Sequence, residues 1–446
     1  MEEALSLIVC VICCALLLSK SRCVYMLCFF LVVRILVPET TRFLGTSISI
    51  NTIVIVFLAL SILINSKIKI GKKDKVFILI LSLYLIYCLV AMFFSDTGSL
   101  NAQMGCLLEF AVTQCFPAIA AVLIVKRRKD LLVINKTFLI STAVACIYGI
   151  ITFILKKNQY VEMLTGKVLE ESVWKGYATF ATFTSTTTFG YFLVLAVPYT
   201  MFLFYNNKEL PKGLIKGALI LTFICVVLCK KRSAMISIIG MCLIFLFMSP
   251  KTKKYFNKIL LCIVACVCAV AVIRVIPSFD KLNNFLTASV FFWNDKAVNV
   301  SRGELGSSME LRVRQALYPF VEIRSNLIFG HGFGWCSWYI REYLLHPVLY
   351  GFESIFATSI CELGLMGLIV YPVLFYQLYR NYLPKEKKTD LGLIFLLTYV
   401  IDIVASGMNY FYLFLLLAVL IRKVKECEYG EYHGKSNCGI VYNTGI

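Results

Sequence analysis

The stretch GLIKGALILTFICVVLCKKRSAMISIIGMCLIFLFMS, residues 213–249, decides the fold class of this protein. It consists of two apolar runs, 213–229 and 233–249, separated by the cations Lys230, Lys231 and Arg232 with no acidic residue to balance them. A helix needs about 20 mostly apolar residues to cross the hydrocarbon core of a bilayer. The two runs therefore predict a pair of membrane helices joined by a cationic turn.

Comparable apolar runs recur along the chain. Of its 446 residues, 60% are hydrophobic and 15% are charged, and the mean hydropathy of +0.82 excludes a soluble globular protein. The sequence predicts an all-α, polytopic integral membrane protein with about twelve to thirteen transmembrane helices. The expected spans are roughly 4–19, 24–37, 48–65, 76–94, 104–125, 131–155, 178–205, 213–229, 233–249, 256–276, 353–379, 391–405 and 409–421. The first run follows two glutamates instead of a basic segment, so we expect no cleavable signal peptide.

The loops between these runs alternate in charge. The basic loops are 20–22, 66–75, 126–130, 206–213, 250–254 and 380–388, and the nearly cation-free ones are 38–47, 95–103 and 406–409. Basic loops face the cytoplasm in most membrane proteins, and the C-terminal tail joins them here. The net charge of +19 thus reflects membrane orientation, and no nucleic acid partner is expected.

This orientation divides the chain into four parts. Residues 1–276 hold roughly the first ten expected spans, and 277–352 form one large extracytoplasmic loop with amphipathic helices. Residues 353–425 hold the C-terminal membrane helices, and 426–446 form a cytoplasmic tail.

Two outward segments carry cations where the charge rule expects few. One is the turn 230–232, and the other is the large loop, with Arg302, Arg312, Arg314, Arg324 and Arg341. Charged and polar residues inside the spans also fall in the outward halves: Arg34, Glu109, Glu362, Asp402 and the hydroxyl run Thr182–Thr188. Such groups usually face a cavity or a partner, so they predict a cation-lined chamber open to the outer side, suited to a lipid phosphate. The alternatives are helix–helix hydrogen bonds for the hydroxyls and ordinary polar surface for the loop arginines.

Four segments carry a resemblance to a known family. They are GYATFATFTSTTTFGYFLVLAVPY (176–199), KKRSAMISII (230–239), MELRVRQALYPFVEIRSNLIFGHGFG (309–334) and GFESIFATSICELGLMGLI (351–369). In order and spacing they resemble the O-antigen ligase/polymerase superfamily, which includes capsular polysaccharide polymerases. The first 170 residues resemble the family in hydropathy alone.

The resemblance implies roles for particular residues. Arg232 matches the arginine that family members use near the lipid pyrophosphate, and Arg312 matches the loop arginine before the glycine-rich turn, residues 330–334. Glu362 opens the Glu-x-Gly-x-x-Gly pattern of the following helix. Glu353 stands where ligases carry a histidine, and this departure favours a polymerase.

The residues themselves suit this chemistry. Arginine holds two phosphate oxygens in a planar fork, and fixed cations stabilise a diphosphate leaving group. The attacking sugar hydroxyl needs a proton acceptor, for which Glu353 is the first candidate and His331 its rival. Arg312 and Arg314 would face different ways on a helix, and the family match favours Arg312 for the phosphates. We expect Glu353, Arg232 and Arg312 to be catalytic, and Lys230, Lys231, Arg314 and His331 to bind substrate.

Other residues near these candidates have simpler interpretations. Glu362 lies too far along its helix to act with Glu353, so a structural role is expected, for example pairing with a buried cation. The aromatic residues after the glycine turn would either stack on sugars or form an interfacial belt: Trp335, Trp338, Tyr339 and Tyr343. We expect no metal and no cofactor.

The sequence therefore predicts a glycosyltransferase of the bacterial cytoplasmic membrane whose active site faces the periplasm or exterior. Its expected substrate is a polyprenyl-pyrophosphate-linked oligosaccharide, which it would polymerise into O-antigen or capsular polysaccharide on the outer face of the membrane. The lipid bilayer is its other expected partner. A chain-length regulator and a flippase are the candidate protein partners. The alternatives are an O-antigen ligase that transfers glycan to lipid A core, and a flippase or transporter for the same lipid-linked sugars. A transporter is expected to show repeated halves with charges near the bilayer midplane, and no repeat is visible here.

Overall fold

The computed structural model describes residues 2–19, 22–65, 70–94, 100–166, 177–207, 209–248, 326–342, 354–380, 391–405 and 410–432, together with Leu317. Every regular element within these ranges is a helix, which confirms the predicted all-α class. One isolated β-bridge, between Arg42 and Ser49, closes the loop after the second helix.

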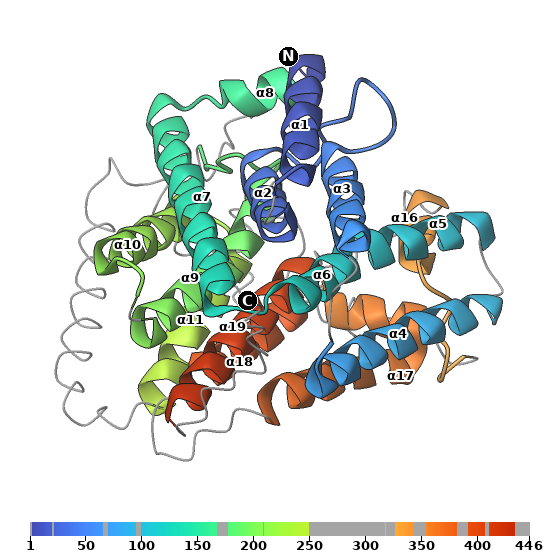
Figure 1. Ribbon diagram of the computed structural model, residues 1–446. Helices are drawn as coiled ribbons and strands as arrows, with labels where there is room; N and C mark the ends of the chain where they lie inside the picture. Colours follow the sequence, from blue (N-terminus) through green and yellow to red (C-terminus); the bar gives the residue numbers. More distant parts are fainter. Residues whose placement is uncertain are drawn as a thin grey trace, which may run out of the picture.

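The helices follow the apolar runs closely. In the labels of Figure 1 they are α1 (Glu2–Leu17), α2 (Arg22–Leu36), α3 (Ile50–Ile64), α4 (Lys72–Phe93), α5 (Leu100–Phe110), the π-helical turn η1 (Ala111–Cys115), α6 (Phe116–Ile124), α7 (Arg128–Leu155), α8 (Gln159–Thr165), α9 (Thr186–Asn206), α10 (Lys212–Leu228), α11 (Arg232–Met248), α16 (Trp335–Glu342), α17 (Ile355–Arg380), α18 (Leu391–Ala405) and α19 (Phe411–Tyr432).

Several of these helices have the length and composition of membrane spans. In the described part of the chain, five helical stretches are long and apolar enough to cross a membrane: Lys72–Phe93, Leu100–Ile124, Arg128–Leu155, Thr186–Asn206 and Ile355–Leu378. Three shorter apolar helices accompany them: Ile50–Ile64, Arg232–Phe245 and Leu391–Val404. The protein is therefore a multi-pass membrane protein. The expected span at 256–276 lies outside the described residues.

The predicted helix boundaries need two corrections. The span expected from residue 178 begins at Thr186, because Ser185 accepts a hydrogen bond from the backbone N–H of Thr188 and starts the helix there. The last helix, α19, continues to Tyr432 and so beyond the expected end of the membrane region at residue 425.

The described loops lie at two ends of the molecule. At one end, here called the Arg34 end, Thr182 Oγ1 donates to the carbonyl of Ile35 and Tyr160 Oη donates to that of Leu36. At the other end, here called the Asp74 end, Asp74 at the start of α4 contacts the α6–α7 turn and the last turns of α19. Successive helices therefore run from one end to the other and back.

The core of the molecule forms around α9. Its residues from Thr188 to Thr200 are buried, and α7, α10, α11, α18 and α19 all lie against it or against its direct neighbours. In Figure 1, α18 and α19 lie beside α9 and α11, while α4 and α17 run alongside each other at the right. A helix that is apolar on all faces needs this complete cover. The arrangement brings the starts of α9, α11 and α19 together at the Arg34 end.

Candidate functional site

The cationic turn that opened the sequence lies at the Arg34 end. α10 ends at Leu228 with Cys229 as its C-cap, Lys230 adopts a left-handed conformation with φ of 52°, and α11 begins at Arg232. The Lys230 ammonium lies 5.6 Å from the ring centroid of Phe153 on α7. The Lys231 ammonium lies 5.9 Å from the ring centroid of Tyr191 on α9. The two lysines therefore point in different directions, and only Lys231 faces the centre of the helix bundle.

The environment of Lys231 is closely confined. A Cβ atom on Gly190 would lie 3.1 Å from Lys231 Cβ and 3.2 Å from its Cγ, so the lysine stem packs directly on the α9 backbone. Asp402 on α18 interacts electrostatically with the ammonium. Asp402 is only 1% exposed, and its Oδ1 atom is buried without a hydrogen-bond partner.

A second cation lies next to this pair. Arg34 at the end of α2 forms a salt bridge with Glu39 (Nη2 to Oε1, 3.3 Å), and its guanidinium lies 4.3 Å from the ring centroid of Tyr412. Tyr410 donates a hydrogen bond to the same Glu39 oxygen at 3.1 Å. The Tyr410 and Tyr191 rings are 6.5 Å apart, which links Arg34 to Lys231 through aromatic side chains.

We call this group the cation–tyrosine cluster; it comprises Arg34, Glu39, Tyr191, Lys231, Asp402, Tyr410 and Tyr412. The cluster joins α2, α9, α18, α19 and the 230–232 turn. The sequence pointed to Arg34, Lys231 and Asp402 but missed Glu39 and the three tyrosines. The one signal for Glu39 was its position five residues after Arg34, just past the end of the same apolar run.

The hydroxyl run before α9 has a largely structural role. Thr182 is buried and donates to the Ile35 carbonyl at 2.6 Å, and Ser185 and Thr188 form the reciprocal N-terminal cap of α9. Thr182 thus bonds to another helix, as the alternative expected, whereas Ser185 and Thr188 cap their own helix. Thr184, Thr186 and Thr187 are half-buried, so they remain candidates to line the chamber.

The glycine-rich turn forms a second unit with α17. The backbone N–H groups of His331 and Gly332 donate to the carbonyls of Cys361 (2.8 Å) and Glu362 (2.9 Å), and that of Leu365 donates to the carbonyl of Leu327 (3.0 Å). α17 is interrupted at this point, where Gly364 has φ of 63° and ψ of −164°. The interruption frees backbone groups of α17, and the glycine-rich turn supplies their partners.

Glu362 connects this unit to α16. Its carboxylate is 8% exposed and accepts a hydrogen bond at 3.2 Å from the backbone N–H of Cys336, in the first turn of α16. A carboxylate at a helix N-terminus satisfies N–H groups that the helix itself leaves unpaired and is stabilised by the helix dipole. The expected structural role of Glu362 is thus found, with a helix N-terminus as its partner instead of a cation.

The aromatic residues of α16 correct one prediction. Trp335 is 2% exposed and stacks between His331 and Tyr339, with 4.5 Å between ring centroids on each side. It is therefore neither a sugar platform nor part of an interfacial belt, because the glycine-rich turn folds over it. His331 is buried in the same stack and belongs to the α16–α17 unit, whereas Lys231 belongs to the cation–tyrosine cluster.

The remaining predicted residues have different positions. Arg232 is half-buried at the first position of α11. Glu353, Arg312 and Arg314 lie outside the described residues. Ser354, which follows Glu353, donates to the carbonyl of Ile403 at 3.3 Å, next to Asp402. Glu109 is exposed on α5 and does not line the chamber.

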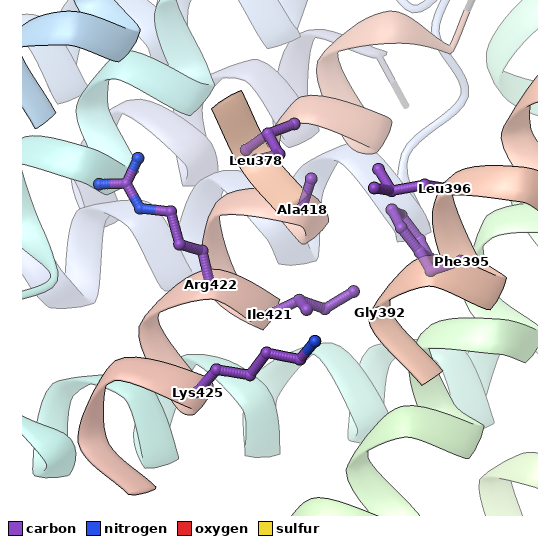
Figure 2. A pocket seen from close by; sticks show the side chains of 8 residues that line it. All are labelled: Leu378, Gly392, Phe395, Leu396, Ala418, Ile421, Arg422 and Lys425. Carbon is purple, nitrogen blue, oxygen red and sulfur yellow. The ribbon is translucent and has the colours of Figure 1, made fainter. Parts of the chain in front are cut away.

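A small pocket lies at the Asp74 end, away from all the predicted site residues. Its lining residues are Leu378, Gly392, Phe395, Leu396, Ala418, Ile421, Arg422 and Lys425. Figure 2 shows the Lys425 side chain extending toward the other lining residues and the Arg422 guanidinium turned away from them. Arg422 is instead paired with Asp74, so the pocket contains one polar group that points inward. This pocket therefore lacks the grouped charged and tyrosine side chains of the cation–tyrosine cluster.

Comparison with known proteins bears on the middle of the chain. Residues 217–371 match the family model described as "O-Antigen ligase". Comparison with curated proteins and with solved structures gives no match. The matched segment begins in α10 and ends in α17, so it includes the cationic turn, the glycine-rich turn and Glu362. Over about a third of its length this chain is similar to the O-antigen ligases, and the match supports its resemblance to the O-antigen ligase/polymerase superfamily.

Proposed function

We propose that this protein is a glycosyltransferase that polymerises polyprenyl-pyrophosphate-linked oligosaccharide repeat units into O-antigen or capsular polysaccharide. In this proposal it works at the outer face of the bacterial cytoplasmic membrane, with the Arg34 end outside. The observation that carries the proposal is the position of the 230–232 turn. It lies within the segment that matches the O-antigen ligase family and at the same end of the bundle as Arg34.

The chemistry follows from the charges. The hydroxyl oxygen of the acceptor sugar forms a bond to the anomeric carbon of the donor, and the bond from that carbon to the pyrophosphate oxygen breaks. The leaving diphosphate carries the electron pair away, and Arg232 and Arg312 stabilise its negative charge. Glu353 accepts the hydroxyl proton. Lys230, Lys231, Arg314 and His331 bind and orient the substrate in this scheme.

Polymerisation is preferred to ligation because of one residue. Glu353 stands where the ligases of the superfamily carry a histidine. A ligase would use the same cations but deliver the glycan to lipid A core, so the acceptor distinguishes the two activities.

A flippase would need a substrate path through the membrane, with interrupted helices exposed to it. α17 is interrupted at Gly364, but the glycine-rich turn occupies the freed backbone groups. The interruption of α17 is therefore better explained as the place where the glycine-rich turn binds than as part of a transport path.

The purified full-length protein in proteoliposomes, supplied with a lipid-linked repeat unit, tests the proposal. We expect a ladder of longer lipid-linked glycans. Arg232→Ala and Arg312→Ala should abolish the ladder, and Glu353→Gln should reduce turnover sharply. Glu109→Gln, which changes an exposed carboxylate on α5, is the matched control and should leave the ladder unchanged.

Two outcomes would contradict the proposed activity, and a third would contradict the role of Glu353. Transfer to lipid A core without a ladder would identify a ligase. Movement of the substrate between leaflets without chain growth would identify a flippase. A wild-type rate for Glu353→Gln would exclude Glu353 as the proton acceptor and leave His331 as the candidate.

A further inference from the structure

Arg34 and Glu39 form an ion pair at the Arg34 end that the proposed reaction does not use. Arg34 Nη2 lies 3.3 Å from Glu39 Oε1, and the two side chains are 11% and 24% exposed. Tyr410 donates to the same oxygen at 3.1 Å, and the Arg34 guanidinium lies 4.3 Å from the ring centroid of Tyr412. Two buried tyrosines thus fix the pair, while both of its charged side chains remain partly exposed.

The pair and its loop have hydrogen-bonding groups that the described residues leave unused. Glu39 makes both of its contacts through Oε1, and Oε2 accepts no hydrogen bond from the described residues. Arg34 carries five N–H donors, and its Nε atom has no partner in the same part of the chain. Thr41, two residues after Glu39, is buried with an equally unpartnered hydroxyl oxygen. Unused polar groups of this kind mark places where water or a ligand binds.

A carboxylate beside a guanidinium suits a sugar better than a phosphate. A hydroxyl group both donates and accepts hydrogen bonds, so neighbouring sugar hydroxyls can pair with the carboxylate and the guanidinium at once. The Arg34–Glu39 pair is formally neutral, whereas the turn 230–232 carries three positive charges. An anionic diphosphate is therefore attracted to the turn, and the neutral pair is left for the uncharged part of the same ligand.

A row of tyrosine rings connects the pair to the turn. The ring centroids of Tyr412 and Tyr410 are 5.6 Å apart, and those of Tyr410 and Tyr191 are 6.5 Å apart. The Lys231 ammonium lies 5.9 Å from the Tyr191 centroid. Three rings separate the two charged groups, so the sugars of an oligosaccharide can lie at the pair while its diphosphate lies at the turn.

We propose that the Arg34–Glu39 pair is a carbohydrate subsite, in which Glu39 Oε2 accepts a hydrogen bond from a sugar hydroxyl of the lipid-linked oligosaccharide. Tyr410 is a positioning residue that holds the Glu39 carboxylate in the orientation for this contact. The inference rests on the proposed function, and it adds a site for sugar to the cations that bind the diphosphate. The pair must then distinguish ligands with sugar from ligands without it, which a purely structural ion pair would not do.

Two probes that differ in sugar alone test the subsite. One is the polyprenyl-pyrophosphate-linked oligosaccharide extracted from the host bacterium, and the other is polyprenyl pyrophosphate of the same chain length. The detergent-solubilised full-length protein should bind the first probe more tightly. Glu39→Gln keeps the shape of the side chain but removes the charge, so it should weaken binding of the first probe about tenfold and leave the second unchanged. Glu109→Gln, on α5, should bind both probes like the wild type.

Tyr410→Phe is a second variant, and it leaves every charge unchanged. It removes the hydroxyl that holds Glu39, so it should weaken binding of the sugar-bearing probe about threefold without affecting the sugar-free probe. In the Glu39→Gln background the same change should add no further loss, because Tyr410 acts through Glu39. Elution of each variant as a single detergent-solubilised species establishes that it is folded. Additive losses in the double variant would exclude Tyr410 as the positioning residue.

Three results would overturn the inference. The first is a wild type that binds both probes equally well, or neither of them. The second is unchanged binding of the sugar-bearing probe by Glu39→Gln, and the third is an equal loss for both probes, which would make the pair purely structural. A glycan ladder in the polymerisation assay would leave the proposed function standing in each case. Sugar-dependent binding that Glu39→Gln weakens, without any ladder, would support the subsite and contradict polymerisation.

Discussion

At the scale of single residues, the charges inside this protein are arranged in groups of opposite sign. At the Asp74 end, Asp74 is 5% exposed and is bonded to Arg422, which is 1% exposed. Lys423 Nζ lies 3.0 Å from Asp74 Oδ2, and Lys126 Nζ lies 3.8 Å from the same oxygen. Burial lowers the pKa of Lys126, and the positive charge of Lys423 lowers it further. Three cations thus surround the Asp74 carboxylate, and Lys126 lies farthest from it and has a lowered pKa.

Removing these cations should have unequal effects on stability. Arg422→Met would leave Asp74 without its most deeply buried partner and should lower the free energy of unfolding by about 3–5 kcal/mol. Lys126→Met should change it by less than about 1 kcal/mol, because two cations remain. Thermal unfolding of the solubilised variants measures both. An equal loss of stability in the two variants would contradict this account of the charges around Asp74.

The pH dependence of the same variants gives a second check. The pKa of Lys126 lies below its usual 10.5, so the folded protein binds this proton less tightly than the unfolded chain does. The charged Lys126 therefore destabilises the folded state. This cost in free energy is fully present below the pKa of Lys126 in the folded protein and disappears as the pH rises toward 10.5. The stability of the wild type relative to Lys126→Met should therefore increase with pH in that range.

At the scale of secondary structure, the interruption of α17 is the feature that organises the predicted site region. Gly364 has a backbone conformation that residues with a side chain rarely adopt, and a Cβ there would lie 2.4 Å from the Ile328 carbonyl oxygen. Gly330 approaches α17 closely in the same way, since a Cβ atom added to it would lie 2.6 Å from the Cys361 carbonyl oxygen. The single hydroxyl group of Tyr87 on α4 lies within hydrogen-bonding distance of the carbonyl oxygens of both Ile328 and Leu363, which ties both segments to the bundle.

Alanine at position 364 should therefore detach the glycine-rich turn from α17. Gly364→Ala should cost about 3 kcal/mol or more, because it combines a strained backbone with contact against a carbonyl oxygen. Gly217→Ala on α10 is the matched control, since no atom lies within 4 Å of its added Cβ. It should gain about 0.5–1 kcal/mol of helix stability. Chemical unfolding measures both, and equal stability of the two variants would show that the interruption does not need glycine.

At the scale of the whole molecule, the two ends differ in the kind of charge they carry. The Asp74 end holds the basic loops 126–130 and 206–213 and the salt bridge of Arg128 with Glu209 at 2.7 Å. The Arg34 end holds the cation–tyrosine cluster and the α16–α17 unit. Because basic loops remain in the cytoplasm, the Arg34 end is expected to face outward.

Epitope tags inserted after Lys157 and after Asn207 test this orientation. Lys157 follows α7 at the Arg34 end, and Asn207 follows α9 at the Asp74 end. Antibody should reach the first tag in intact spheroplasts and the second only after the membrane is permeabilised. A side-specific label on residues 230–232 should behave like the first tag. Labelling of that turn from the cytoplasmic side alone would overturn the proposed function.

The sequence by itself determined the all-α membrane class, the positions of most described helices and the alternation of the loops between two ends. These features depend on local composition, because about 20 apolar residues form a helix in lipid whatever surrounds it, and loop charge sets its direction. The tertiary structure alone decided that Lys230 and Lys231 diverge, that Glu362 caps α16, and that Trp335 and Asp402 are buried. Each of these outcomes depends on which helices pack together and at what angle. Side chains that are far apart in the sequence become neighbours only through this packing, so the residues around each of them do not reveal its partner.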